Sequence, residues 1–182
     1  MVRKIIILLS FISLMSCIVS NNKYGLKRIS SYKFTLNPNQ NSKVYNLIDT
    51  TAFYKTIYIE DSINNTNNNG PIRKNVEINS GLVFYTNGKV GGFYDYNSPT
   101  KQIDYDPSKA VMGYYEYKDG VLYLEFLKNY PTGNFLSIEI IVRYTEDTLV
   151  SFVQKTARGG GFKNIYVRQE LPENVLDFKP DW

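Results

Sequence analysis

Apolar and polar residues alternate with a period of two through most of this chain after residue 50. In the segment 137–144, the aliphatic residues Ile138, Ile140 and Val142 fall on one face and Glu139 falls on the other. A period of two is typical of a β-strand with one buried face. We therefore expect the three aliphatic side chains to face the core and Glu139 to face the solvent.

The pattern predicts about eight strands that follow one another through short turns. Asn87-Gly88 separates two of them, and Asp119-Gly120 separates two others. These dipeptides favour tight hairpins, because both central residues of a type I′ turn need positive φ angles. Residues 32–36 are a candidate for one further strand, and no segment after Cys17 has a helical period. The expected strands are 53–60, 81–86, 89–95, 110–117, 121–127, 135–144, 149–155 and 164–169.

Sequential hairpins with short turns describe an antiparallel up-and-down meander. Eight such strands in one domain close most simply into a barrel, since closure pairs the edge strands that would otherwise be exposed. We therefore expect an all-β, lipocalin-like barrel. A two-sheet β-sandwich is the alternative architecture.

The N-terminal segment differs from the rest of the chain. A short basic start is followed by an apolar run of about eleven residues, and Cys17 closes it. The run is well short of the ~20 residues that a membrane-spanning helix needs, and this order of features is typical of a secretory signal peptide. We expect residues 1–16 to be the signal peptide, residues 17–31 a lipidated N-terminus and polar tether, and residues 32–182 a single domain.

The residues before Cys17, Leu14-Met15-Ser16, resemble the lipobox of bacterial lipoproteins. This resemblance implies that Cys17 carries a diacylglyceryl group and usually a further amide-linked chain. Two or more acyl chains anchor a protein stably, at ~0.8 kcal/mol per buried methylene. Ile18 stands where lipoproteins of the inner membrane commonly have aspartate, and no acidic export signal follows. We therefore expect a lipid anchor in the outer membrane, with the domain facing the periplasm.

Composition narrows the chemistry of the mature chain. The sequence has no histidine and one cysteine. This excludes Ser-His-Asp and Cys-His nucleophilic sites and, once Cys17 is lipidated, metal sites built on His or Cys. The formal charge of +4 falls to +2, from 19 basic and 17 acidic residues, when Arg3 and Lys4 leave with the signal peptide. Because acidic and basic residues are interspersed, we expect no nucleic-acid binding, and no cofactor is implied.

Two hairpin segments resemble the small lipocalin-like lipoproteins of Bacteroidota. They read GLVFYTNGKVGGFY at 81–94 and GYYEYKDGVLYLEF at 113–126. In the second segment, a Gly-x-Tyr strand turns at Asp-Gly into a strand that ends in Glu-Phe. The resemblance covers roughly residues 50–168. Because most members of that group have no established activity, it implies a fold rather than a particular function.

The densest aromatic group in the chain is a candidate for the lining of a ligand site. Eight-stranded barrels are just wide enough to hold one small ligand, and aromatic side chains are common in such sites. The alternative is that this group packs in the core or across strands. Its members are Phe93, Tyr94, Tyr114, Tyr115, Tyr117 and Tyr123.

Acidic residues offer two further candidate sites. Asp95, Asp104 and Asp106 stand in or near a long loop, where their oxygens suit Ca²⁺, although their spacing is too sparse for an EF-hand and favours a solvated loop. Glu116, Glu125 and Glu139 lie on predicted strands. Two of them close together would suit a glycosidase, but nothing in the spacing brings any two together.

These features favour a non-enzymatic binding protein for a small apolar or glycan ligand. The alternative is an accessory lipoprotein with a filled core, which binds a protein partner through the long loops at 61–70 and 97–109. A hydrolase built on carboxylates is the third interpretation. A cavity inside the strands favours the first, and a packed interior with an exposed apolar patch favours the second. Two carboxylates in one cleft favour the third.

Overall fold

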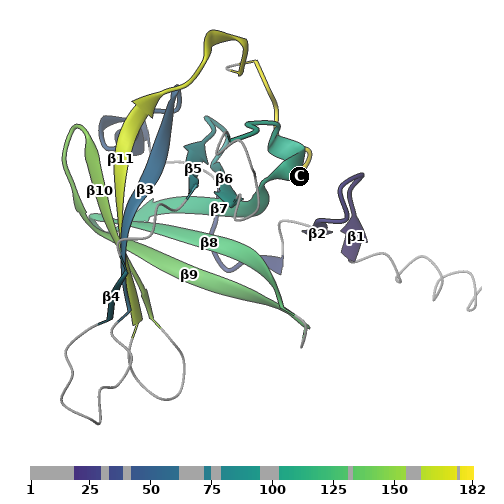
Figure 1. The fold of residues 1–182 in the computed structure, drawn as a ribbon, viewed down its shortest axis with the longest axis horizontal. Helices are drawn as coiled ribbons and strands as arrows, with labels where there is room; N and C mark the ends of the chain where they lie inside the picture. Colours follow the sequence, from purple (N-terminus) through teal and green to yellow (C-terminus); the bar gives the residue numbers. More distant parts are fainter. Residues whose placement is uncertain are drawn as a thin grey trace, which may run out of the picture.

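The computed structural model of the chain shows a closed β-barrel (Figure 1). The described residues are 19–29, 33–38, 42–61, 72–74, 79–94, 103–130, 133–154, 161–175 and 177–182. The predicted signal peptide and Cys17 lie outside these ranges. Within them, helix is confined to short 3-10 segments, among them η2 (Ser42–Asn46), η3 (Pro107–Lys109) and η4 (Glu173–Val175).

Eight strands form the barrel, and each pairs antiparallel with the next of the eight. The last of them pairs with the first, which closes the ring. A short strand, β4 (Ile72–Lys74), pairs with the far end of the first. The predicted all-β, up-and-down, lipocalin-like barrel is confirmed, and the sandwich is not formed. The eight are β3 (Ala52–Asp61), β5 (Ser80–Phe84), β6 (Lys89–Tyr94), β7 (Val111–Lys118), β8 (Val121–Tyr130), β9 (Gly133–Tyr144), β10 (Thr148–Gln154) and β11 (Gly161–Glu170).

Both predicted tight turns join neighbouring strands. Asp119 and Gly120, between β7 and β8, have φ angles of 53° and 83°, as a type I′ turn requires. In the turn between β5 and β6, Gly88 has a φ of 77°. Each expected strand lies within a few residues of its predicted bounds, because alternation identifies the strands and turn residues mark where they stop.

One end of the barrel interior is filled by large apolar side chains. Phe84, Tyr115 and Phe126 are fully buried. Phe84 meets Tyr54 and Tyr115 edge to face, with ring centroids 5.4 Å apart in each pair. Val44 of η2 is fully buried in the same cluster, so η2 covers this end. Each such burial contributes about 1.5–3 kcal/mol, and we call this region the closed end.

The predicted orientation of β9 is wrong. Leu124 belongs to the closed-end core and is paired with Glu139 across β8 and β9, so Glu139 also points into the barrel. Ile138 and Val142 are instead 43% and 61% exposed on the outer surface. The alternation is present as predicted, but its polar face turns inward, where it supplies a buried hydrogen-bond network.

The opposite wall of the barrel is covered on its outer face. Phe53, Val83 and Phe93 point outward and are buried beneath residues of the segments 103–110 and 171–182. As a result β5 is buried at all five of its positions. This double burial explains why β5 lacks the alternation of a strand with one exposed face.

Residues 33–36 do not form the further strand that the sequence predicts at 32–36, and they run instead as turns and bends. Glu125 holds this segment against the barrel. Its carboxylate accepts hydrogen bonds from the backbone amides of Thr35, at 2.7 Å, and Leu36, at 3.1 Å. Glu125 is 1% exposed, and such charge-assisted bonds to backbone amides replace the β-ladder.

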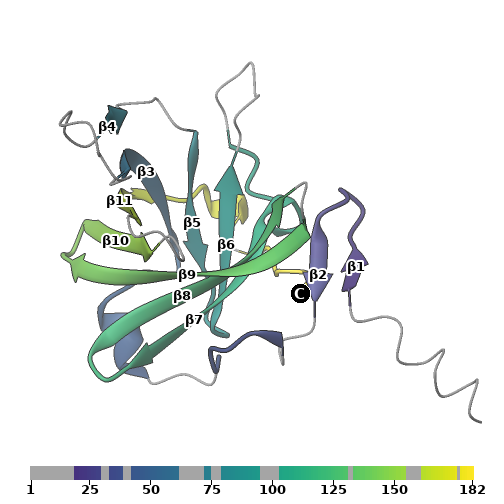
Figure 2. The same ribbon diagram turned by 90° about the horizontal axis from the view of Figure 1, so that it is seen from below.

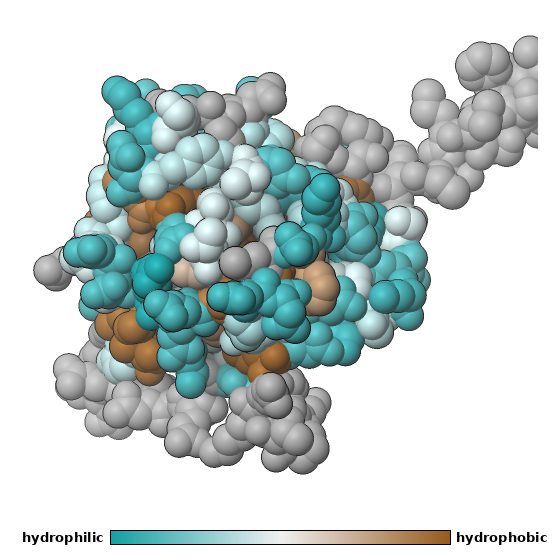
Figure 3. All heavy atoms as spheres, turned by 90° about the horizontal axis from the view of Figure 1, so that it is seen from above, coloured by the Kyte–Doolittle hydropathy of each residue, from teal (hydrophilic) through white to brown (hydrophobic). Residues whose placement is uncertain are grey.

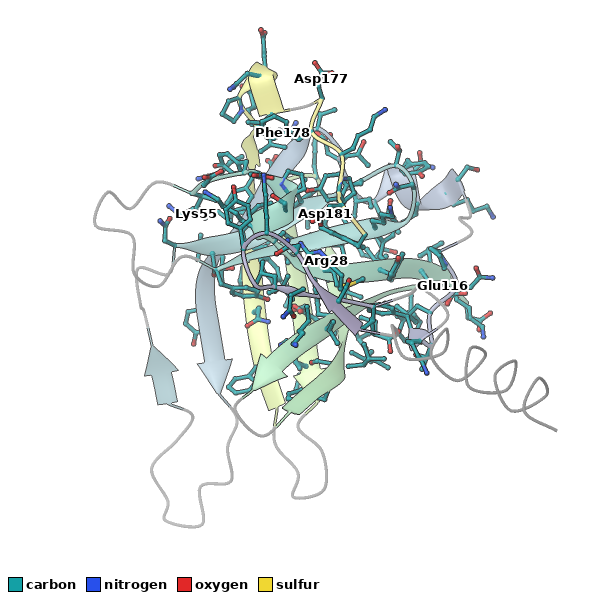
Figure 4. The ribbon with its side chains drawn as sticks, turned by 90° about the vertical axis from the view of Figure 1, so that its right-hand side faces the viewer. Arg28, Lys55, Glu116, Asp177, Phe178 and Asp181 are labelled. Carbon is teal, nitrogen blue, oxygen red and sulfur yellow. The ribbon has the colours of Figure 1, made fainter. Side chains whose placement is uncertain are left out.

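Part of the predicted tether is folded. β1 (Val19–Asn21) pairs with β2 (Lys27–Ile29), and this hairpin lies beside the C-terminal residues (Figure 2). Arg28 Nε donates to Asp181 Oδ1 at 2.7 Å, and Arg28 Nη2 donates to the carbonyl of Ser108 at 3.1 Å. The guanidinium also stacks on the ring of Trp182. Arg28 and Asp181, labelled side by side in Figure 4, thus fix the hairpin to the domain.

Candidate ligand site at the polar end of the barrel

The barrel interior changes character along its length. Beyond the closed end, the inward-facing side chains are mostly polar. Register pairs Ser151 with Asn164 on the inner face, and Ser80 Oγ donates to Thr56 Oγ1 at 2.9 Å. We call this region the polar end. Val153 and Phe162 also face this region, since they are paired two residues beyond Ser151 and Asn164. Its polar and tyrosine side chains are those of Thr56, Ser80, Tyr94, Lys128, Glu139, Ser151, Asn164 and Tyr166.

Glu139 is the centre of a hydrogen-bond network at the polar end. Its Oε1 accepts from the hydroxyl of Tyr166 at 2.6 Å and from Nδ2 of Asn164 at 3.1 Å. The hydroxyl of Ser151 also donates to Oε1. Burial and the nearby charge of Glu139 raise the pKa of Tyr166, so its hydroxyl stays protonated and keeps donating.

The second oxygen of Glu139 is not used by this network. Glu139 is 3% exposed, and no described residue donates a hydrogen bond to its Oε2. The three donors therefore converge on one oxygen of the carboxylate, Oε1.

Lys128 faces the same space from β8, two residues beyond the inward-facing Phe126. Burial lowers the pKa of its ammonium group, and the negative charge of Glu139 opposes that shift. In the described part of the chain, no residue forms an ion pair or hydrogen bond with this ammonium. Lys128 and Glu139 thus offer a donor and an acceptor to one bound molecule.

The six aromatic residues predicted to line a ligand site do not form one site. Tyr115 and Tyr117 belong to the closed-end core. Phe93 and Tyr114 point outward and are buried beneath the covering segments. Tyr123 alternates with the inward-facing residues of β8 and lies on its outer face. Neighbours along a strand point to opposite faces, so a dense group in the sequence is divided in space.

Tyr94 is the member of that group that contributes to the polar end. It is paired with Ser80 across β5 and β6 and is 39% exposed. The other polar residues could not be recognised from the sequence, because alternation alone predicts Glu139 on the outer face. Simple alignment of the predicted hairpin of 135–144 and 149–155 would not have shown this site, because a register shift between Val150 and Ser151 is what places Ser151 and Glu139 on the same face.

The three strand carboxylates do not share one face of the barrel wall. Glu116 and Glu125 lie on the outer face of the barrel, since Tyr115 and Leu124 beside them belong to the interior core. Glu139 lies inside. Glu116 and Glu125 accept hydrogen bonds from the consecutive backbone amides of Asn37 and Leu36, so both hold the segment 33–38 against the barrel.

In the predicted acidic loop, the carboxylates form hydrogen bonds and an ion pair with nearby protein groups. Asp106 accepts from the amide of Ser108 at 2.9 Å and so caps η3. Asp104 forms an ion pair with Lys109, and its hydrogen bond with Lys109 lowers the pKa of Asp104. The described residues contain no cluster of three or more side chains suited to holding a metal ion.

Comparison with known proteins gives no family for the chain. No family model and no curated protein match it. Of the helical segments within the described ranges, none has the length and apolar character needed to cross a membrane. Function is therefore inferred from the barrel interior and the N-terminal sequence.

Proposed function

We propose that this chain is an outer-membrane lipoprotein, similar to the lipocalin-like lipoproteins, whose barrel binds a small apolar or glycan ligand. The observation that carries the proposal is the polar end, where the buried carboxylate of Glu139 and the ammonium of Lys128 lie among hydroxyl and amide groups. A bound ligand with hydroxyl groups could both donate to the carboxylate of Glu139 and accept from the ammonium of Lys128, and hydrogen bonds to charged groups contribute about 1.5–3 kcal/mol each.

The lining favours a glycan among these ligand classes. Carboxylate, ammonium, amide and hydroxyl groups surround the polar end, and they suit the closely spaced donors and acceptors of a sugar. Tyr94 and Tyr166 add aromatic faces, which pack well against apolar C–H groups. At the closed end, Phe84, Tyr115 and Phe126 fill the interior, so the ligand would lie toward the polar end.

Native mass spectrometry of the mature domain, purified without its lipid from its own host, tests this proposal. We expect a population heavier than the chain by the mass of one small molecule, and we expect the excess to disappear on denaturation. Measurement of the bare chain mass under both conditions would contradict a bound ligand.

The anchor is tested separately by Cys17→Ser. This change removes the acyl chains that hold the protein in the bilayer, so we expect the protein to move from washed membranes to the soluble fraction. Wild-type protein from the same preparation is the control. If the variant stays with the washed membranes, lipidation of Cys17 does not anchor the protein.

A second candidate is an accessory lipoprotein that binds a protein partner. The observation that favours it is the exposed aliphatic side chains of the outer wall, with Ile57 at 48% and Val142 at 61%. On the face shown in Figure 3, however, hydrophilic surface divides the hydrophobic surface into separate patches. Co-purification of one stoichiometric partner with a barrel free of small molecules would favour this candidate.

A further inference from the structure

A second concave site lies outside the barrel, at its closed end. The residues after η2, the turn between β5 and β6, the turn between β9 and β10, and the end of β11 surround a cleft of about 730 Å³. Sites for small molecules usually measure about 300–1,000 Å³. None of the polar-end residues lines this cleft, so the two sites are separate.

Tyrosine rings form the apolar surface of this cleft. The hydroxyl of Tyr45 donates to the carbonyl of Thr86 at 2.5 Å, which fixes the ring, while Tyr45 remains 40% exposed. Tyr144, at the end of β9, is 38% exposed. A fixed, half-exposed ring is a ready surface for stacking, because little side-chain entropy is lost when a ligand covers it.

Arg168 supplies hydrogen-bond donors to the cleft. Its Nε and Nη2 donate to Asp49 Oδ2 at 2.9 and 2.6 Å, and Asp49 Oδ1 accepts from the amide of Thr51 at 2.8 Å. Although burial raises the pKa of Asp49, the hydrogen bonds from Thr51 and Arg168 outweigh it, and the net shift is downward. The pair therefore stays ionised, and Nη1 of Arg168 has no hydrogen-bond acceptor among the described residues.

The charge of the cleft restricts the ligand further. Asp49 and Arg168 neutralise each other, and the exposed Glu146 and Asp147 leave an excess of two negative charges. An anionic ligand would be repelled at this range. Of the two aliphatic lining residues, Ile48 is 4% exposed and Leu47 is partly buried, so an acyl chain would find a small aliphatic surface to cover.

We infer that this closed-end cleft binds a neutral oligosaccharide. The sugar rings stack on Tyr45 and Tyr144, the free Nη1 of Arg168 donates to ring or hydroxyl oxygens, and the carboxylates of Glu146 and Asp147 accept from hydroxyls. This site goes beyond the ligand proposed for the barrel interior and does not depend on it. A chain tethered at its N-terminus would present the cleft as a second recognition surface.

The test uses the mature chain with Cys17→Ser and four neutral trisaccharides: maltotriose, cellotriose, mannotriose and triacetylchitotriose. Backbone NMR signals are followed during titration to about 10 mM, which detects affinities in the millimolar range. We expect at least one trisaccharide to shift the signals of Tyr45, Thr86 and 144–147. Trigalacturonate, the anionic probe, should bind with an affinity at least tenfold lower than that of the active neutral trisaccharide.

Variants separate stacking from other effects. Tyr45→Ala should weaken the active trisaccharide at least tenfold, whereas Tyr45→Phe, which keeps the ring, should stay within about threefold of the wild type. Phe178→Ala, which removes an aromatic side chain 43% exposed and outside the cleft, should bind as the wild type does. Glu139→Gln should also leave this affinity unchanged, so failure at one site is distinguishable from failure at the other.

The inference is overturned if no neutral trisaccharide shifts the signals of Tyr45, Thr86 and 144–147. It is also overturned if the shifts fall on Lys128, Glu139 and Ser151, or if trigalacturonate binds as tightly as the neutral sugars. The wild-type titration gives this answer even if Tyr45→Ala proves unstable.

Discussion

Gly81→Val is expected to destabilise the barrel by at least about 3 kcal/mol. A Cβ atom at Gly81 would lie 2.4 Å from the carbonyl oxygen of Tyr54 and 2.4 Å from Cζ of Phe53. The carbonyl belongs to the backbone of β3, which pairs with β5 at this point. It cannot withdraw without opening the junction between the two strands. Urea-induced unfolding followed by circular dichroism measures the loss.

Gln169→Val is the matched control for this substitution. It also introduces a valine into a barrel strand, but at an exposed position near the end of β11. Surface changes of this kind usually alter stability by less than about 0.5 kcal/mol. If Gly81→Val unfolds at the same urea concentration as Gln169→Val, β3 and β5 do not approach each other closely at Gly81.

Replacement of Glu139 is expected to separate ligand binding from folding. In Glu139→Gln, the amide oxygen still accepts from Tyr166, Ser151 and Asn164, so the barrel should fold. The second oxygen becomes an NH₂ donor, and ligand affinity should fall about 10- to 100-fold, the loss of one charge-assisted hydrogen bond. Isothermal titration calorimetry with the ligand extracted from the native protein measures this change in affinity.

Two further substitutions complete this comparison. Glu139→Leu leaves the hydroxyls of Tyr166 and Ser151 without their acceptor, while Asn164 Nδ2 keeps its bond to Ser151 Oγ at 3.3 Å. The substitution should lower the free energy of unfolding by about 2–5 kcal/mol. Glu116→Gln neutralises a carboxylate on the outer face and should change neither stability nor affinity. Wild-type affinity in Glu139→Gln would show that the ligand does not contact the polar end.

Much of the barrel could be predicted because its signals are local. Alternation identifies each strand, and Asp119-Gly120 marks a turn that only positive φ angles can make. The strand at 121–127 extends to Tyr130 in the structure. Pairing with β9 continues there, whereas the sequence loses its alternation after Leu127.

The orientation of β9 could not be predicted from its own residues. Alternation defines two faces, but only the partner strand decides which face is inside. Here the pairing of Leu124 with Glu139 places a carboxylate in the interior. The buried carboxylate is stabilised by hydrogen bonds from Ser151 and Asn164, which belong to strands later in the chain.

The candidate site was hard to locate for the same reason. The polar end is assembled from seven strands, so no short segment of sequence contains it. Tyr114 and Tyr115 are adjacent in sequence but lie on opposite faces of β7. Many aromatic residues in one strand therefore indicate that both faces of the barrel wall are buried, and they do not by themselves indicate a ligand site.

The most direct test of ligand binding at the polar end compares what two proteins carry from the cell. The mature domain and its Glu139→Gln variant are purified without lipid from the native host, and organic-solvent extracts of both are examined by mass spectrometry. We expect a single enriched small molecule from the wild type and at least tenfold less of it from the variant. An empty wild-type extract, or equal amounts from both proteins, would contradict a ligand held by Glu139.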